Sequence, residues 1–396
     1  MSSAKNIFKK YQAQTFPFPS CLEIERAKGS YITDVKGRKY LDFVAGVSAC
    51  TLGHSNPIIT DAVEKQLDKY THVMVYGEYI QSPQYKLAKL LADNLPKSLD
   101  CTYFTNSGTE AIEGAMKLAK RATCRSEIIS CRNSYHGSTQ GALSIMGNEE
   151  KKAKFRPLLP DCYQIIFNNT STLENITNKT AAVVIEPIQG ATGFVIPTNK
   201  FLQKVRKKCN ETGAILIFDE IQTCFGRLGT LFGFEKFNMI PDILCIAKGM
   251  GAGMPIGAFI SSKELMSLLT FKPQLGHITT FGGHPVNCAA SLACLDYLLT
   301  TEIMKEVEQK EQQFRMHLNH PKIKEIRGKG LMLAIEFEDE LLTKKVVEQS
   351  LENGLILFYF LFNKTAIRIT PPLTISDKEI IKGCKIIKEI LKKNKY

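Results

Sequence analysis

The chain has 396 residues, of which 44% are hydrophobic and 23% are charged. These fractions are ordinary for a globular protein and exclude a disordered, collagen-like or coiled-coil chain. The longest apolar run, 355–362, has eight residues, far fewer than the roughly 20 that span a bilayer. The first residues contain no apolar stretch typical of a secretory signal. We therefore expect a cytoplasmic protein of two or three structural units.

The net charge of +12 comes from 51 Lys and Arg against 39 Asp and Glu. Residues 364–396 supply half of it, with nine basic and three acidic residues. The lysines of this tail alternate with apolar residues, which predicts a final amphipathic helix with a solvated basic face. We expect neither a nucleic acid nor a membrane as partner, although a positive charge would suit both.

The twelve cysteines are scattered, and no two of them form the C-x-x-C pair of zinc ribbons and redox motifs. His317 and His320 form an H-x-x-H pattern, but no cysteine or carboxylate stands at ligand spacing. We predict no metal site, and we expect reduced, mostly buried cysteines.

The N-terminal segment, residues 1–50, contains β-rich pieces at 31–34 and 40–43 on either side of a Gly37-Arg38 turn. This pattern predicts a β-meander. Because chain termini often lie close together, we expect the segment to pack with the C-terminal unit.

Residues 51–300 are predicted to form a large α/β domain, because short apolar runs alternate with helical patterns such as 111–122 and 199–212. Several runs are continuously apolar, as expected of strands buried on both faces of a parallel sheet. The predicted strands are 102–105, 127–131, 163–167, 181–185, 215–218 and 243–246.

Residues 301–396 are predicted to form a smaller α+β domain, because long charged helical patterns there alternate with a few short apolar runs. The expected elements are a helix at 302–317, a strand at 331–337, a helix at 343–353, apolar runs at 355–362 and 366–369, and the final helix.

Lys248 follows an apolar run and stands in the glycine-rich stretch 247–255. Glycines let a flat ligand approach closely, and a lysine in a crowded site can lose its proton and form a Schiff base. A lysine in an ordinary turn is the alternative.

Asp219 ends the buried run AILIF, where an unpaired carboxylate would be very costly. It needs a cationic partner, and the protonated pyridine nitrogen of a cofactor would fit. An arginine or a helix N-terminus is the alternative partner.

A strand leads into a polar turn at Ser107, Gly108 and Thr109, and a helix follows. Backbone N–H groups and hydroxyls at a helix N-terminus suit a phosphate, although a simple helix cap is as good an explanation for this turn alone. Taken together, the turn, the buried aspartate and the lysine outline a pyridoxal-phosphate site.

With these features the chain resembles the class III pyridoxal-phosphate-dependent aminotransferases, the group of ornithine, acetylornithine and 4-aminobutyrate aminotransferases. The resemblance implies fold type I, with a large domain around a mainly parallel sheet and a smaller α+β domain formed by both termini. It also implies a homodimer with shared active sites. The matching stretches are 34–42, 52–54, 106–111, 135–137, 186–190, 218–226, 248–257, 279–285, 327–332 and 368–372.

The resemblance also implies roles for single residues. Lys248 would form the Schiff base and move a proton, and Asp219 would pair with the pyridine nitrogen. Gln222 would lie near the phenolic oxygen of the ring, and Arg368 would bind the α-carboxylate of an amino or oxo acid. The other implied contacts are Ser107, Gly108 and Thr109 around the phosphate, Thr280 from the partner subunit, Tyr135 and Ile221 on the two ring faces, His136 beside the ring, and Glu186 as a supporting carboxylate.

Three positions depart from the ornithine-type pattern. Ser138 replaces an arginine that holds a substrate carboxylate, Ala191 replaces a glutamate that masks the carboxylate arginine, and His284 replaces an asparagine. We expect an aminotransferase with ping-pong kinetics that moves an amino group from an acetylornithine- or ornithine-like donor to an oxo acid such as 2-oxoglutarate, as in arginine biosynthesis. An α-amino donor, as in the alanine–glyoxylate-like branch, is the alternative, and an isomerase or decarboxylase of the same fold is a more distant one.

Overall fold

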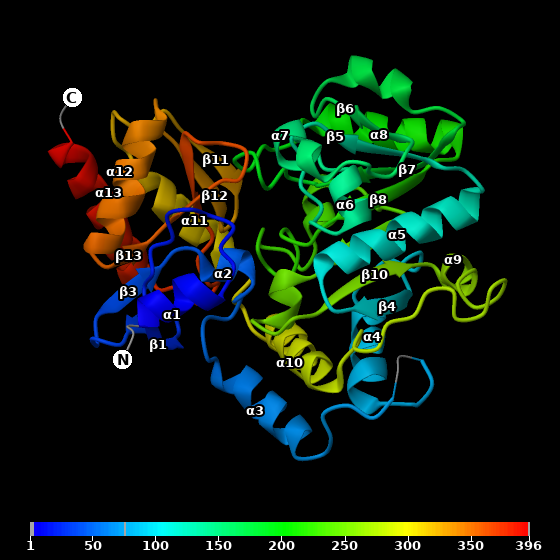
Figure 1. Cartoon of the computed structure of the whole chain (residues 1–396), viewed down its shortest axis with the longest axis horizontal. Coiled ribbons are helices and arrows are strands. Elements are labelled where there is room, and N and C mark those ends of the chain that lie inside the picture. Colours follow the sequence, from blue (N-terminus) through cyan, green and yellow to red (C-terminus); the bar gives the residue numbers. More distant parts are fainter. Residues whose placement is uncertain (1–3, 75–76, 395–396) are drawn as a thin grey trace.

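The computed structural model describes residues 4–74 and 77–394. The chain forms two lobes side by side (Figure 1). The larger lobe is built around a seven-stranded sheet, and the smaller lobe contains two four-stranded sheets. The predicted fold type I architecture, with a large α/β lobe and a smaller α+β lobe, is confirmed.

The large sheet has the strand order β4-β10-β9-β8-β7-β5-β6. All neighbours in it run parallel except β10, which is antiparallel to both β4 and β9. Each of the six predicted strands is present, and β10 is an addition. The strands are β4 (Cys101–Thr105), β5 (Glu127–Cys131), β6 (Cys162–Ile165), β7 (Thr180–Ile185), β8 (Ile215–Asp219), β9 (Ile243–Ile246) and β10 (Gly257–Ser261).

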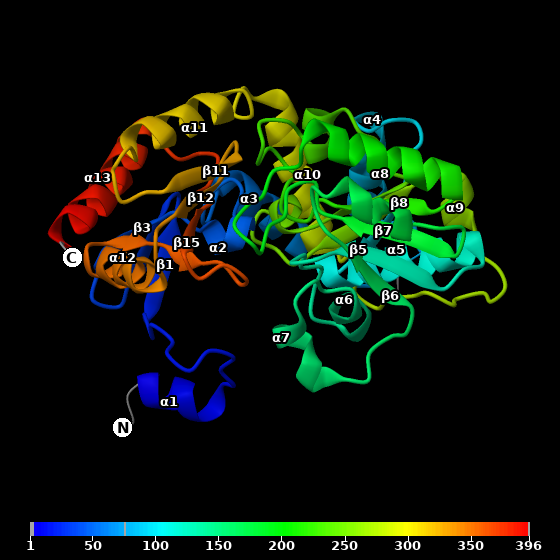
Figure 2. The same ribbon diagram turned by 90° about the horizontal axis from the view of Figure 1, so that it is seen from above.

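Helices cover both faces of this sheet (Figure 2). The helix α5 (Gly108–Thr123) packs on one face, with Ile217 of β8 in the same apolar cluster. The helix α8 (Asn199–Thr212) packs on the other face, together with Leu216 and Phe218. Successive residues of a strand point to opposite faces, so a strand covered on both sides must be apolar throughout.

The small lobe combines both ends of the chain. One sheet has the order β1-β2-β3-β13, in which β13 (Leu355–Ile356) pairs in parallel with β3 (Lys39–Asp42). The domain boundaries at residues 50 and 300 stay a prediction. The other elements are β1 (Ile24–Lys28), β2 (Tyr31–Asp34), β11 (Glu325–Lys329), β12 (Met332–Glu336), β14 (Phe358–Tyr359), β15 (Ala366–Ile369), α11 (Glu306–His317), α12 (Glu340–Glu352) and α13 (Asp377–Lys393).

A helix that the sequence analysis did not predict, α10 (Pro285–Thr300), lies between the lobes (Figure 1). It packs against α3 (Pro57–Leu67) and α4 (Ser82–Asp93) and against η4 (Lys248–Gly251). Its apolar residues surround the helix instead of forming one stripe, so it lacks the 3.6-residue period of a surface helix.

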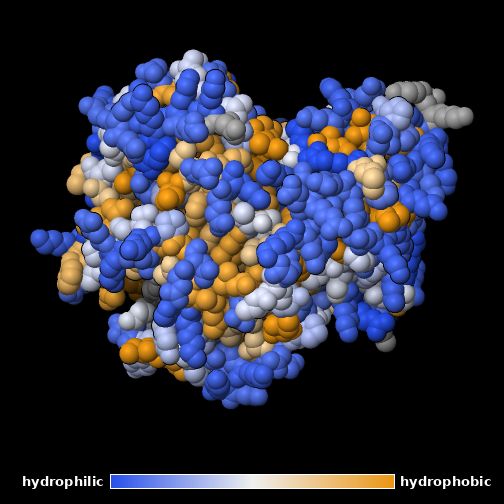
Figure 3. All heavy atoms as spheres, turned by 180° about the vertical axis from the view of Figure 1, so that it is seen from behind, coloured by the Kyte–Doolittle hydropathy of each residue, from blue (hydrophilic) through white to orange (hydrophobic). Residues whose placement is uncertain are grey.

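The first helix, α1 (Ala4–Tyr11), has no buried residue and lies away from the body of the molecule (Figure 2). Seen from behind, apolar side chains form a broad area across the middle of the molecule (Figure 3). Within residues 4–74 and 77–394, no helix combines the length and the apolar character needed to cross a membrane.

A short turn between β3 and the large lobe has an uncommon conformation. The four residues of α2 (Ala45–Ser48) have φ angles of 49°, 61°, 59° and 69°. This left-handed conformation costs roughly 1–2 kcal/mol per residue other than glycine. It persists where the surroundings fix it, and such strain is concentrated at functional sites.

Candidate active site

Three of the predicted site residues lie at one edge of the large sheet. Asp219 is the last residue of β8, and Lys248 comes two residues after β9, the neighbouring parallel strand. Ser107 comes two residues after β4, which runs in the same direction as β9 because both are antiparallel to β10. Ligands of open α/β sheets bind at the carboxyl ends of the strands, so this edge is the candidate site.

The partner of Asp219 within the chain is His136. Its Nδ1 lies 2.7 Å from Oδ2 of Asp219, and both side chains are buried. The backbone N–H of Ile221 donates to the other oxygen at 3.1 Å. Burial acts to lower the pKa of His136, but the hydrogen bond to Asp219 and its charge outweigh burial and raise it. The raised pKa of His136 favours its protonated form beside Asp219.

Lys248 is partly buried, with a φ angle of +46°. Burial lowers its pKa; Asp219 and Glu186 act against this, while Arg368 adds to it. A lysine whose pKa is lowered spends more time as a neutral amine, which is the nucleophilic form.

Glu186 is a second buried carboxylate at this site. Burial raises its pKa to about 7, although His136 acts in the opposite direction. Its oxygens accept the backbone N–H groups of Tyr135 at 3.3 Å and Gly190 at 2.9 Å. These contacts fix the segments on both sides of the site.

Ser107 caps the first turn of α5, and its Oγ accepts the N–H of Glu110 at 3.3 Å. The simple cap considered above is therefore present. Gly108, the next residue, packs directly on Ile221, because a Cβ there would lie 2.6 Å from Cδ1 of that side chain. The hydroxyl of Thr109 lies 2.7 Å from that of Thr139.

Arg368 lies on β15, in the smaller lobe, and is buried. Its Nε donates to the carbonyl of Tyr359 at 3.2 Å, and its guanidinium stacks 4.9 Å above the ring of Phe360. Burial lowers its pKa to about 10. No carboxylate of the described residues is paired with it, and its charge acts on Lys248.

A family model for class III aminotransferases matches residues 12–391. The acetylornithine aminotransferases of Bacillus cereus and Methanopyrus kandleri are 36% and 35% identical to the chain. These alignments cover 98% and 96% of the chain and 97% and 96% of those proteins. The solved ornithine aminotransferase of Toxoplasma gondii has a TM-score of 0.91 at 30% identity, over 98% of this chain and 94% of that one.

The chain belongs to the class III aminotransferases. The enzymes of this class depend on pyridoxal phosphate, and so does this chain. The residues at the sheet edge fit that group, since they offer a buried carboxylate, a lysine of lowered pKa and an N–H-rich helix start. The Nε2 of His136 is buried and has no hydrogen-bond partner in the part of the chain that the structure describes, which also marks this edge as a place for a ligand.

Of the remaining predicted residues, Ser138 is exposed, and its Oγ lies 3.2 Å from the hydroxyl of Tyr135. Ala191 is buried, and its carbonyl accepts the N–H of Phe362 at 3.0 Å. Thr280 is exposed in the loop before α10. The aminotransferase therefore presents Ser138 and Thr280 on its surface.

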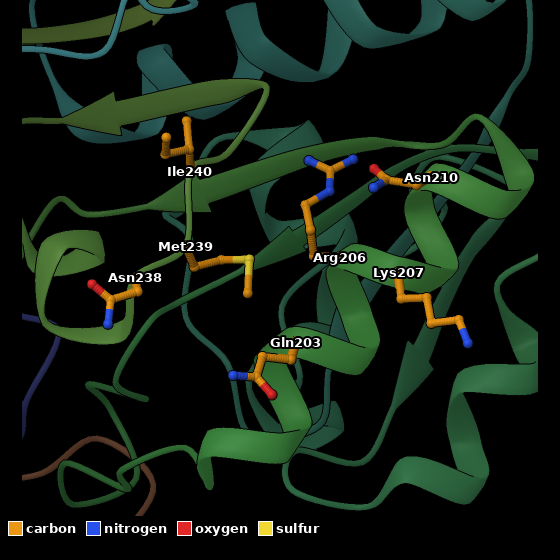
Figure 4. A pocket seen from close by; sticks show the side chains of 7 residues that line it. All are labelled: Gln203, Arg206, Lys207, Asn210, Asn238, Met239 and Ile240. Atoms are coloured by element: carbon orange, nitrogen blue, oxygen red, sulfur yellow. The ribbon is translucent and has the colours of Figure 1, made fainter.

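A hollow of 490 Å³ lies elsewhere on the surface, between α8 and the segment before β9 (Figure 4). Arg206 in its wall is paired with Asp242 at 2.9 Å. The hollow contains neither Lys248 nor Asp219, so it is separate from the candidate active site. Its lining residues are Gln203, Arg206, Lys207, Asn210, Asn238, Met239 and Ile240.

The contact of Gln222 with Ser48, like the pairing of His136 with Asp219, was not predicted from the sequence. The side-chain amide of Gln222 donates from Nε2 to Oγ of Ser48, at 3.1 Å. Ser48 lies in the left-handed turn α2, 174 residues away in the chain. No motif at Ser48 signals this contact, although the turn belongs to the N-terminal segment that was expected beside the smaller lobe.

Proposed function

We propose that this aminotransferase moves an amino group from an amino acid to an oxo acid such as 2-oxoglutarate, in two successive half-reactions. The observation that carries the proposal is Arg368, which is buried, close enough to act on Lys248, and without a carboxylate partner among the described residues. A planar guanidinium binds a carboxylate through two parallel hydrogen bonds. Both the amino donor and the oxo-acid acceptor carry such a group.

Bound pyridoxal phosphate withdraws electrons from the amino-acid substrate, which makes the proton on its Cα acidic. We assign Lys248 Nζ to hold the cofactor at rest, then to take this proton and return it at C4′ of the cofactor. Asp219 would keep the pyridine nitrogen protonated, and His136 would orient its carboxylate through the hydrogen bond at 2.7 Å. Lys248 and Asp219 are thus the catalytic residues of the proposal.

The other residues bind and orient. Ser107, Gly108 and Thr109 hold the phosphate at the start of α5, where backbone N–H groups point outward. The remaining assignments are Tyr135 and Ile221 on the two ring faces, Gln222 at the phenolic oxygen, His136 and Glu186 as supporting groups beside the ring, and Ser138 next to the substrate.

We further propose a homodimer in which Thr280 of one subunit reaches the phosphate of the other. The broad apolar area on the rear face supports an interface, because monomers rarely expose large apolar patches (Figure 3). Thr280 itself is exposed, and its neighbour Phe281 is 53% exposed.

Two donor classes each have support. The acetylornithine aminotransferases, at 36% and 35% identity, favour an acetylornithine- or ornithine-like donor. Ser138 and Ala191 favour an α-amino donor. Ser138 cannot replace the arginine that holds a second substrate carboxylate, and Ala191 cannot replace the glutamate that pairs with the carboxylate arginine while an ω-amine reacts. An unmasked Arg368 would bind the α-carboxylate in both half-reactions.

A donor panel tests the proposal. The enzyme loaded with pyridoxal phosphate is mixed with acetylornithine, ornithine or alanine, and the aminated cofactor is measured before any oxo acid is added. Its accumulation, with release of the oxo product, is the expected result for at least one donor. Product formation without an aminated cofactor for every donor would instead identify an isomerase or decarboxylase.

A further inference from the structure

The left-handed turn α2 brings a buried hydroxyl to the edge of the active site. Ser48, its last residue, is 2% exposed, and its hydroxyl accepts the hydrogen bond from Gln222. The turn also packs against η4, the short helix that begins at Lys248. The strained turn therefore lies beside the site, and the side chain of its last residue contacts a site residue.

The amide of Gln222 is fixed at its nitrogen, and its oxygen lies close to Gly190. Its Nε2 donates to Ser48, and its Oε1 faces Gly190, where a Cβ would come within 2.8 Å of that oxygen. An amide nitrogen carries two hydrogens, and Ser48 takes one of them. No acceptor among the described residues takes the second N–H, which is therefore available to a ligand.

We propose that Ser48 is a positioning residue, whose hydroxyl fixes the Gln222 amide so that its second N–H is directed to the phenolic oxygen of the bound cofactor. This inference rests on the role given to Gln222 in the proposed function. Without the hydroxyl, the amide is free to turn and to present its oxygen, which cannot donate a hydrogen bond.

Two side chains hold the turn in its conformation. Oδ1 of Asp42 accepts the N–H groups of Val44 at 2.7 Å and Ala45 at 3.1 Å. The hydroxyl of Thr370 donates to the carbonyl of Val44 at 2.9 Å. Thr370 directly follows β15, which carries Arg368. Both contacts come from the small lobe, which thus fixes the start of the turn that carries Ser48.

The absorption of the resting, cofactor-loaded enzyme, measured against pH, tests this role. The phenolic oxygen and the nitrogen of the lysine–cofactor link share one proton. A phenolic oxygen that loses a donor holds this proton more tightly, so the chromophore of Ser48→Ala should titrate at a higher pH. We expect a rise of about 0.5–1 pH unit, the scale of one hydrogen bond.

Ser48→Gly and Ala45→Gly separate the hydroxyl from the backbone. Glycine suits a positive φ, so Ser48→Gly removes the hydroxyl and keeps the turn. It should shift the titration as Ser48→Ala does, whereas Ala45→Gly should not. A shift in Ser48→Ala but not in Ser48→Gly would overturn the proposal, as would wild-type titration in both.

A double-mutant cycle tests whether Ser48 acts through Gln222. Gln222→Ala should raise the titration pH by itself, and Ser48→Ala should add nothing to it. A full additional shift would overturn the positioning role. If Gln222→Ala leaves the titration unchanged, the role of Gln222 in the proposed function fails instead.

None of these substitutions changes a charged or titratable group that acts on Lys248. Those groups are Asp219, Arg368, Glu186 and the thiol of Cys224. The shift therefore reports the amide and the hydroxyl alone.

Discussion

At the candidate site, the two lobes hold their buried charges in different ways. In the large lobe, the charge of Asp219 is paired with His136, and Glu186 accepts two backbone N–H groups. In the small lobe, Arg368 is just as buried but donates only to a carbonyl and stacks on a ring. An unpaired buried charge is costly, so a site that keeps one is prepared for a ligand of opposite sign. In the proposed function, the buried carboxylates of the large lobe are therefore already partnered within the chain, whereas Arg368 would gain its partner from the substrate.

The largest expected effect comes from removing Lys248, the site lysine of the large lobe. Lys248→Ala should lower the transamination rate by at least about 10³-fold, because in the proposed function this lysine is both the nucleophile and the proton carrier. Lys152→Ala is the matched control, since Lys152 is also a buried lysine whose pKa burial lowers. Borohydride reduction and peptide mapping should place the pyridoxyl group on residue 248, and a label on another lysine would contradict the assignment.

The paired carboxylate comes next. Asp219→Asn should still bind the cofactor but keep less than a tenth of the wild-type kcat, since an amide does not hold the pyridine nitrogen protonated. A tenfold loss corresponds to about 1.4 kcal/mol. Glu220→Gln changes the adjacent buried carboxylate, which accepts the N–H of Phe234 at 2.6 Å. Glu220→Gln should reduce stability and spare kcat. If Asp219→Asn instead loses stability and keeps its kcat, Asp219 has only a structural role.

A glutamate at residue 191 sharpens the comparison by adding a possible partner for Arg368. Ala191→Glu should weaken α-amino donors by about 1–3 kcal/mol, because the new carboxylate competes for the guanidinium. Donors that present an ω-amine should be hurt less, so the ratio of ω-amine to α-amine half-reaction rates should rise. Ala191→Gln adds the same bulk without the charge and should leave the ratio close to that of the wild type. An unchanged ratio in Ala191→Glu would mean that residue 191 does not control access to Arg368.

The smallest expected effect concerns a paired histidine outside the site. His54 lies 2.8 Å from Asp42, and the hydrogen bonds that its ring makes to Asp42 and to Cys50 raise its pKa to about 10. The folded pKa lies above the ordinary 6.5, so the added stability is complete below pH 6.5 and disappears as pH rises through 10. Urea unfolding should show a loss of about 1 kcal/mol in His54→Gln at pH 6. Relative to the control His317→Gln, the loss in the free energy of unfolding should be smaller at pH 10 than at pH 6. An equal loss at both pH values would contradict the pairing.

Much of the large lobe could be predicted from the sequence because its strands are covered on both faces. The predicted runs within β7, β8 and β9 are apolar throughout. Such a run can be recognised as a buried strand without knowing which elements pack against it. The strand β10 (sequence GAFIS) was missed because its glycine, alanine and serine give no clear strand pattern. The helix α10 was missed because burial on several sides removes the apolar stripe.

At the candidate site, local motifs predicted which residues stand at the strand ends, but not how they pair. His136 and Asp219 are 83 residues apart, and Ser48 and Gln222 are 174 apart. Such pairs depend on how the elements pack, and the spacing of residues along the chain gives no information about this packing. The sequence showed that Asp219 needed a partner; it did not show that His136 would be the one within the chain.

The most direct test of the contrast between the lobes is Arg368→Ala, measured in each half-reaction separately. The apparent affinity for the amino donor and for the oxo acid should each fall by about 10–100-fold, the scale of a lost charge-assisted contact. A primary amine without a carboxylate should react as it does with the wild type, and Arg206→Lys at the distant hollow should change nothing. If the acids keep their affinity in either half-reaction, Arg368 is not the common carboxylate site, and the account of the small lobe is wrong.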